Sequence, residues 1–206
     1  MLTEPLSKIE KVVEQIRYCQ PSIVLACSHP DYKFDLQTWD GCRTSLVVGA
    51  YPLGILGTAL LRLAGFGAYV VEIVPEGSAM VELYCTAGNL AMIFEYSGIA
   101  TTAVELISHM SRSSDYLMTD ITNEGVTMRV DAGQLARQIV CFNQVVADSV
   151  NSNCSHFEMA LCDMLNLNSK FNHLLEETFP HRFCLEDYDK AFNLNNPGHI
   201  KTAIEV

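Results

Sequence analysis

Cysteine and histidine are the residue types in this sequence that could do chemistry in pairs, since the chain has eight cysteines and six histidines. A cysteine beside a histidine can act as a nucleophile, but no cysteine here stands in a family-specific local signature. Cys154, His156 and Cys162, followed by His173, could supply metal ligands. Structural zinc usually takes two close pairs of ligands, and only one close pair is present. We therefore expect no metal site, and a helix with a buried cysteine and solvent-facing histidines.

Glycine-rich and acidic segments are further candidates for a functional site. Gly65-Phe66-Gly67 has the composition of a phosphate loop, but it follows a predicted helix and enters a predicted strand. A dinucleotide loop needs the reverse order, because the phosphate binds at the start of a helix. The acidic groups Glu176-Glu177 and Glu186–Asp189 lack a complementary base and are typical of a solvated surface. The sequence therefore predicts no catalytic residue and no cofactor.

Composition limits the class of protein. The 206 residues are 49% apolar and 18% charged, which is enough to bury a core. A net charge of -11 argues against nucleic acid and against anionic membranes as partners. The first residues are acidic and lack the apolar core of a signal peptide. The cysteines are scattered without a C-x-x-C pair, which favours buried free thiols in a reducing compartment. We expect a cytoplasmic protein.

The elements that would hold a site can be predicted from apolar spacing. Residues Thr3–Gln20 have a helical stripe that ends before Pro21, and residues 22–27 and 32–39 have the pattern of two strands. Thr44–Leu61 contains no charged residue and is near the lower limit for a membrane span. Its proline and glycines favour a buried element instead. We predict one helix over Thr44–Ala64, interrupted at Pro52, with a strand in its first half as the alternative.

Residues Gly67 to Arg112 predict an antiparallel meander closed by a helix. Three apolar runs of about seven residues (68–74, 79–85 and 90–96) are separated by turn residues, and Ile99–Met110 has helical spacing. The predicted fold class is therefore α+β: two strands, a helix, a three-stranded antiparallel meander and a helix, over residues 1–112.

Residues 113–206 are predicted to form a hairpin followed by a mainly helical, acidic extension. The hairpin would pair 115–122 with 126–130, and helices would cover 131–150, with Asp131 as N-cap, and 155–178. More than half of the net negative charge lies in this part. Two interpretations stay open: the extension covers a sheet face of residues 1–112, or it presents an acidic surface to a basic partner.

The order of elements over residues 1–112 resembles the roadblock domain of dynein light chains and small-GTPase regulators, a relative of profilin-like and longin folds. The resemblance is carried by residues 72–83 as a hairpin, Leu90–Phe94 as an apolar strand and Ile99–Met110 as a closing helix. It implies a non-enzymatic regulatory or scaffold protein that acts through protein–protein contacts on a small Ras-like GTPase. It also implies a homodimer, or a heterodimer with a similar chain, paired through the central helix.

Four residues are the predicted interface. The uncharged helix could cover the sheet with one face and a twin helix with the other, which places its leucines in the contact. A tryptophan beside a turn is either a core lid or an interface anchor. The residues are Leu53, Leu56, Leu60 and Trp39.

Two other hypotheses stay open. The chain could be a small-molecule sensing domain of another α+β fold, such as the 4-vinyl-reductase-like domains, or a small enzyme with an unrecognised site.

Overall fold

A five-stranded sheet forms the centre of the protein in a computed structural model that describes residues 2–19, 44–72, 90–119, 127–172, 174–194 and 201–205. Its strands lie in the order β2-β1-β3-β4-β5, and every neighbouring pair is parallel. The strands are β1 (Thr44–Val48), β2 (Gly67–Val71), β3 (Leu90–Glu95), β4 (Asp115–Met118) and β5 (Val145–Asp148).

The predicted α+β fold with an antiparallel meander is therefore wrong. The runs that begin at Gly67 and Leu90 are strands, but both pair with β1, one on each side and both in parallel. An apolar run of five or six residues predicts a buried strand without stating its direction. Direction is set by the connections, and parallel neighbours need a crossover such as a helix between them.

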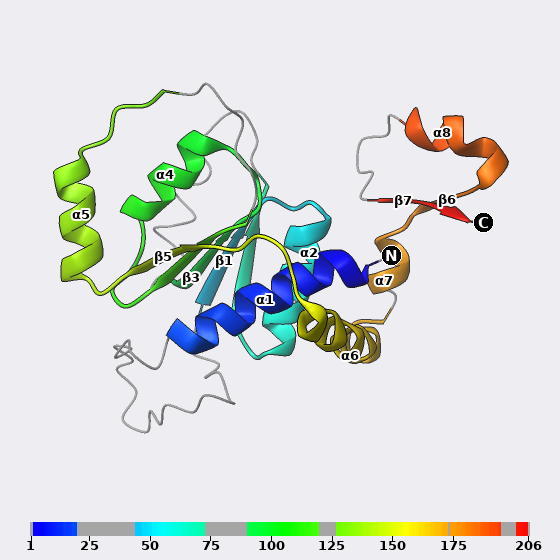
Figure 1. The fold of residues 1–206 in the computed structure, drawn as a ribbon, viewed down its shortest axis with the longest axis horizontal. Coiled ribbons are helices and arrows are strands. Elements are labelled where there is room, and N and C mark those ends of the chain that lie inside the picture. Colours follow the sequence, from blue (N-terminus) through cyan, green and yellow to red (C-terminus); the bar gives the residue numbers. More distant parts are fainter. Residues whose placement is uncertain are drawn as a thin grey trace.

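Helices cover both faces of the sheet (Figure 1). On one face lie α1 (Thr3–Cys19), α2 (Pro52–Leu63) and α6 (Cys154–Lys170), and on the other α4 (Ala100–Ser108) and α5 (Ala132–Cys141). Side chains alternate between the two cores with the period of two that a strand imposes. Val47 and Leu117 join the core under α1 and α2, whereas Leu46 and Tyr116 join the core under α4.

The segment Thr44–Ala64 forms a strand and a helix, so the single interrupted helix is wrong and the alternative, a strand in the first half, is confirmed. Ser45 to Val48 are fully buried in β1, and Gly49 leaves the strand. Pro52 is the first residue of α2, where its fixed φ and missing N–H suit a helix start. The proline thus begins a helix and does not kink one.

The second half of the chain differs from its prediction in a similar way. Asp131 is the predicted N-cap of α5, and its carboxylate accepts a hydrogen bond from the Gln134 N–H at 2.9 Å, which confirms that prediction. The helix ends at Cys141, however, and β5 lies within the remaining part of the predicted helix. The predicted hairpin is also absent at its first strand, because β4 pairs in parallel with β3 and β5.

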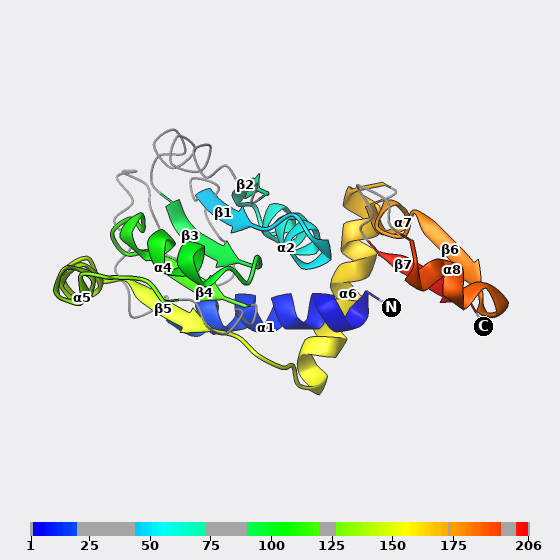
Figure 2. The same ribbon diagram turned by 90° about the horizontal axis from the view of Figure 1, so that it is seen from above.

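A smaller unit follows α6 and lies on the opposite side of that helix from the five-stranded sheet (Figure 2). It contains α7 (Leu174–Glu177), β6 (His181–Cys184), the 3-10 helix η2 (Leu185–Asp187), α8 (Tyr188–Phe192) and β7 (Thr202–Glu205). Strands β6 and β7 pair in parallel, and α8 contacts both.

Several predictions fall outside the described residues. These are the strands at 22–27 and 32–39, Trp39, and the middle run of the meander at 79–85. The sheet takes β1, β2 and β3 from residues 1–112 and β4 and β5 from residues 113–206. The predicted division into a domain of residues 1–112 and an extension of residues 113–206 stays a prediction. Within the part of the chain that the structure describes, no helix has the length and apolar character needed to cross a bilayer.

Candidate functional site

The candidate site lies at the carboxyl ends of β1 and β3, where the strand order reverses. The chain leaves β1 through α2 to reach β2 on one side, while β3 lies on the other side of β1. Ligands of open α/β sheets bind in the crevice at such a switch point. A cleft of about 300 Å³ is found there. Its lining includes Glu4, Lys8, Tyr51, Tyr96, Ser97 and Lys201.

The turn from β1 into α2 is too tight for any residue but glycine at two positions. Gly49 has φ +97°, and a Cβ on it would lie 3.1 Å from the carbonyl carbon of Tyr96. A Cβ on Gly54 would lie 1.8 Å from the carbonyl oxygen of Gly49, which is far inside van der Waals contact. The backbone of the turn therefore folds directly against the first turn of the helix and against the end of β3.

The start of α2 is arranged to bind an anion. Tyr51 is the N-cap and makes no side-chain cap, and no acidic residue lies in the first turn. The first N–H groups of a helix have no acceptor within the helix, so those of Leu53 and Gly54 point out of its positive end. Pro52 contributes no N–H. Such a helix start is suited to a phosphate group.

Glu72 fixes this turn to the neighbouring strand. The residue follows β2 directly, and its Oε2 accepts a hydrogen bond from the Ala50 N–H at 2.6 Å. The Gly49 N–H donates to the Val71 carbonyl oxygen at 2.8 Å. A carboxylate thus stands at the carboxyl end of β2, beside the glycine turn.

A buried carboxylate, that of Glu95, orders the end of β3. Its Oε1 accepts hydrogen bonds from the N–H and the hydroxyl of Ser97, the first of these at 2.7 Å. Its backbone oxygen accepts from Thr119, from the N–H at 3.1 Å and the hydroxyl at 2.8 Å. Tyr96, the residue between Glu95 and Ser97, is 4% exposed, and burial raises the pKa of its phenol well above the usual range. Among the described residues the Tyr96 hydroxyl has no hydrogen-bond partner.

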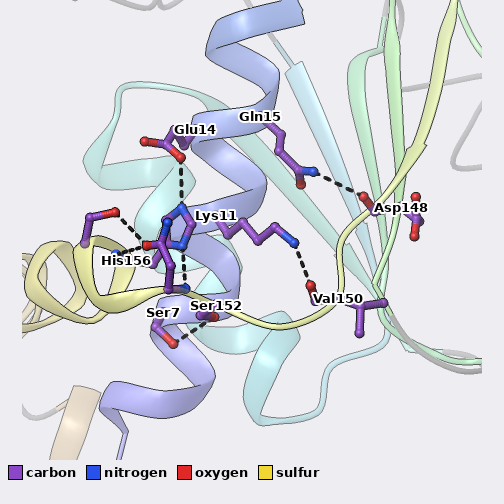
Figure 3. Close-up of polar contacts among 10 residues, drawn as sticks. Ser7, Lys11, Glu14, Gln15, Asp148, Val150, Ser152 and His156 are labelled. Carbon is purple, nitrogen blue, oxygen red and sulfur yellow. Dashed lines mark hydrogen bonds and ion pairs between the residues drawn. The ribbon is translucent and has the colours of Figure 1, made fainter.

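The wall of the cleft formed by α1 is held by the segment after β5 (Figure 3). The Ser7 hydroxyl forms a hydrogen bond with the Ser152 hydroxyl, with 3.1 Å between the two oxygens. Lys11 Nζ donates a hydrogen bond to the Val150 carbonyl oxygen at 2.5 Å. These bonds, together with those of His156, attach α1, and therefore Glu4 and Lys8, to the segment that joins β5 to α6.

His156 is a buried link between the two helices (Figure 3). Its Nδ1 accepts from the Asn153 N–H at 3.0 Å, so the proton of the neutral ring is on Nε2. Nε2 lies 2.8 Å from Glu14 Oε2 and donates to it. Asn153 Oδ1 in turn accepts from the His156 N–H, which completes a capping box at the start of α6.

The predicted interface leucines lie on α2. Leu56 and Leu60 are 0% and 4% exposed and pack in this chain's own core, and Leu53 is half-buried at the cleft. Trp39 lies outside the described residues. A role for these residues in a subunit contact stays a prediction.

The other candidates from sequence do not gather into a site. Cys154 and Cys162 are exposed free thiols, and His156 is committed to Asn153 and Glu14. The described cysteines Cys141 and Cys184 are exposed too, so the expected burial of thiols is wrong for these four. No group of three His, Cys, Asp or Glu that could hold a metal ion occurs in the described ranges.

Sequence reasoning missed the glycine turn and Glu72. The signal was present: the buried run 46–48, then Gly49, then Gly54 at the head of an apolar helix, with an acidic residue about 20 positions after Gly49. The prediction of one helix across this segment removed the required order of strand, turn and helix. Tyr51 hid the motif further, because it stands where G-x-G-x-x-G has its middle glycine.

A parallel sheet with a switch point, entered by a glycine-tight strand-to-helix turn, defines the chain as a Rossmann-like α/β domain. The sequence model of the family described as "Glucose dehydrogenase C-terminus" matches residues 78–206. The chain belongs to this family.

Curated relatives and solved structures agree with this assignment. "Glucose 1-dehydrogenase 2" of Vulcanisaeta moutnovskia is 27% identical over 219 residues, and "Glucose 1-dehydrogenase 1" of Caldivirga maquilingensis is 26% identical over 219 residues. Each alignment covers 100% of this chain and 58% of the relative, so the chain spans little more than half the length of these relatives.

Two solved structures share the fold. A Haloferax mediterranei glucose dehydrogenase in complex with NADP, Zn and gluconolactone has a TM-score of 0.81 at 22% identity, covering 100% of this chain and 58% of that chain. A putative zinc-binding dehydrogenase from Sinorhizobium meliloti bound to NADP has a TM-score of 0.68 at 16% identity, covering 99% and 58%.

These findings correct the functional predictions. The resemblance to a roadblock domain is wrong, because the chain matches the model of the glucose dehydrogenase C-terminus family and its five-stranded sheet is parallel. A non-enzymatic scaffold or regulator is wrong for the same reason, since the relatives are named as enzymes. The order of strand-like runs and helices suggested a roadblock domain. That order is compatible with more than one fold, because it does not say which strands pair or in which direction. A small GTPase as partner was implied only by that resemblance.

Proposed function

We propose that this chain binds a nicotinamide dinucleotide and serves as the cofactor-binding part of an oxidoreductase that acts on an aldose such as glucose. The observation that carries the proposal is the turn Gly49–Gly54 at the switch point, where a Cβ on Gly54 would meet the Gly49 oxygen at 1.8 Å. This turn brings backbone N–H groups to the mouth of the crevice, which is what binding a pyrophosphate requires. Relatives named glucose 1-dehydrogenases support the substrate.

The residues present fit such a cofactor at most positions. The N–H groups of Leu53 and Gly54 would face the pyrophosphate, and the carboxylate of Glu72 would lie at the adenosine ribose. The cleft lined by Tyr96 and Lys201 continues from there over the end of β3. When bound, the nicotinamide supplies a group that accepts or gives a hydride. The chain's own residues supply binding and orientation.

Tyr51 is the departure from the dinucleotide fingerprint. The middle glycine normally allows the backbone to approach the pyrophosphate closely. Tyr51 has a side chain that lines the cleft, and the residue is 61% exposed. A ring on the solvent side of the turn can lie beside a phosphate instead of under it, but it narrows the entrance. We expect it to weaken binding without preventing it.

Binding of the nucleotide by the 206-residue chain tests the proposal. Titration with NADH and NADPH, followed by nicotinamide fluorescence and by calorimetry, should show saturable binding of at least one of them. Tyr51→Gly should tighten that binding by about tenfold, because a closer approach strengthens a backbone hydrogen bond to the charged pyrophosphate, and such bonds contribute about 1.5–3 kcal/mol. Tyr51→Phe keeps the ring and should bind as the wild type does. If the protein is folded by circular dichroism and binds neither NADH nor NADPH, the proposal is refuted.

The described residues do not fit a zinc ion as they fit the nucleotide. The metal is named for the Haloferax mediterranei structure, but the described residues of this chain do not bring together a set of ligands for it.

Two further properties are proposed. A cytoplasmic location is supported by free thiols at each of the four cysteines that the structure describes, since thiols persist in reducing compartments. Self-association is the prediction that light scattering would test, with a mass equal to one chain as the contrary result.

A further inference from the structure

The carboxylate of Glu72 occupies the position that distinguishes the two nicotinamide dinucleotides. The residue follows β2 and is tied through Oε2 to the Ala50 N–H at 2.6 Å. In a Rossmann-like domain with pyrophosphate at the start of the first crossover helix, the adenosine ribose reaches the carboxyl end of the second strand. An anchored carboxylate there can accept hydrogen bonds from ribose hydroxyls, and a 2′-phosphate would meet its negative charge.

The hydrogen bond from the Ala50 N–H holds the Glu72 carboxylate beside the turn. An exposed glutamate would otherwise rotate away from a second negative charge at little cost. Here rotation gives up a hydrogen bond between a charged acceptor and a backbone N–H, which is among the stronger kinds. The carboxylate therefore stays beside the turn when a nucleotide enters.

The sequence around this position offers no cation for a 2′-phosphate. Between Arg62 and Arg112 there is no lysine or arginine. Arg62 is in the last turn of α2, about 15 Å along the helix from its start. Lys8 and Lys201 line the cleft beside β3, and β1 lies between β3 and β2. A 2′-phosphate would thus meet an anchored anion, and residues 73–89, which follow β2 in the sequence, contain no lysine or arginine.

We propose that Glu72 makes this site select NAD over NADP. The inference rests on the proposed function, since it assumes that the turn Gly49–Gly54 holds the pyrophosphate. Two solved structures that share the fold were bound to NADP. The preference for NAD is therefore argued from the residues of this chain and not from those structures. Bonds from ribose hydroxyls to a carboxylate, together with repulsion of the phosphate, predict a ratio of dissociation constants of at least about tenfold.

The test compares NADH with NADPH on the full chain at low ionic strength, by calorimetry and nicotinamide fluorescence. The wild type should bind NADH at least about tenfold more tightly. Glu72→Gln removes the charge and keeps an oxygen that can accept from Ala50, so the ratio should fall to within about threefold. Glu158→Gln, at an exposed position on α6, changes the net charge equally and should leave the ratio as in the wild type.

Each outcome decides between the two proposals. Equal binding of both nucleotides by the wild type, or tighter binding of NADPH, overturns the preference and leaves the proposed function in place. An unchanged ratio in Glu72→Gln overturns the role of Glu72. If that variant does not fold, Glu72→Asp takes its place: it keeps the charge and should keep the preference for NADH, and loss of the preference overturns the assignment. Binding of neither nucleotide by the wild type overturns the proposed function and this inference with it.

Discussion

Replacement of Gly54 by alanine is the most direct test of the turn that forms the site. The added Cβ would lie 1.8 Å from the Gly49 carbonyl oxygen and 3.0 Å from its carbonyl carbon. The contact is with backbone, so no side chain can rotate aside. To restore even a 3.0 Å separation, the turn and the helix must move apart by 1.2 Å (3.0 minus 1.8). That shift strains the bonds from Gly49 to Val71 and from Ala50 to Glu72.

Two opposing effects set the magnitude. Alanine favours a helix over glycine by about 1 kcal/mol. Overpacking typically costs about 1–3 kcal/mol and occasionally more, and a contact at 1.8 Å with immobile backbone belongs at the upper end of that range. We therefore expect Gly54→Ala to lower the free energy of unfolding by at least about 2 kcal/mol. Nucleotide binding should be lost too, because the displaced turn no longer presents its N–H groups together.

Gly133 provides a matched control in the same chain. It lies in the first turn of α5, and a Cβ there would be 3.5 Å from Asp131 Oδ1, an ordinary contact. Gly133→Ala should therefore be neutral or stabilising by up to about 1 kcal/mol. Urea unfolding followed by circular dichroism measures both variants. If Gly54→Ala were as stable as Gly133→Ala, the described geometry of the turn would be refuted.

Two other predictions concern buried polar side chains. Tyr96→Phe removes a hydroxyl that has no partner among the described residues and should stabilise the fold by about 1 kcal/mol. Burial raises the pKa of this phenol above its ordinary 10.0, so the folded state holds the proton more tightly than the unfolded state. The wild type should therefore lose stability as the pH rises above 10.0, and Tyr96→Phe should lose less. Equal slopes of the free energy of unfolding against pH, measured by urea unfolding, would contradict this. His156→Ala removes the bonds to Asn153 and Glu14 and should cost about 2–3 kcal/mol in thermal or urea unfolding. The exposed ion-pair residue Lys190 is the control, since Lys190→Ala should change stability by less than about 1 kcal/mol, and a similar loss in both variants would show that the histidine link is not stabilising.

Local features of the chain were readable from sequence because they depend on near neighbours. The helix at Thr3 was predicted almost to its bounds, since its stripe of apolar residues and the proline after it act within a few residues. The cap at Asp131 was predicted for the same reason. The runs at Gly67 and Leu90 were predicted as strands because apolar runs bounded by turn residues indicate strands.

Only the tertiary structure decided how the strands pair and what the turns are for. Strands β2 and β3 are both parallel to β1, and this follows from crossover connections and from burial on two faces, which a period of two cannot encode. The pairing creates the switch point, and the switch point brings Glu72 beside Gly49 and Tyr96 beside Gly57. These residues lie on separate elements of the sequence. Their types were visible from the start, but their meeting at one edge of the sheet was a consequence of strand order.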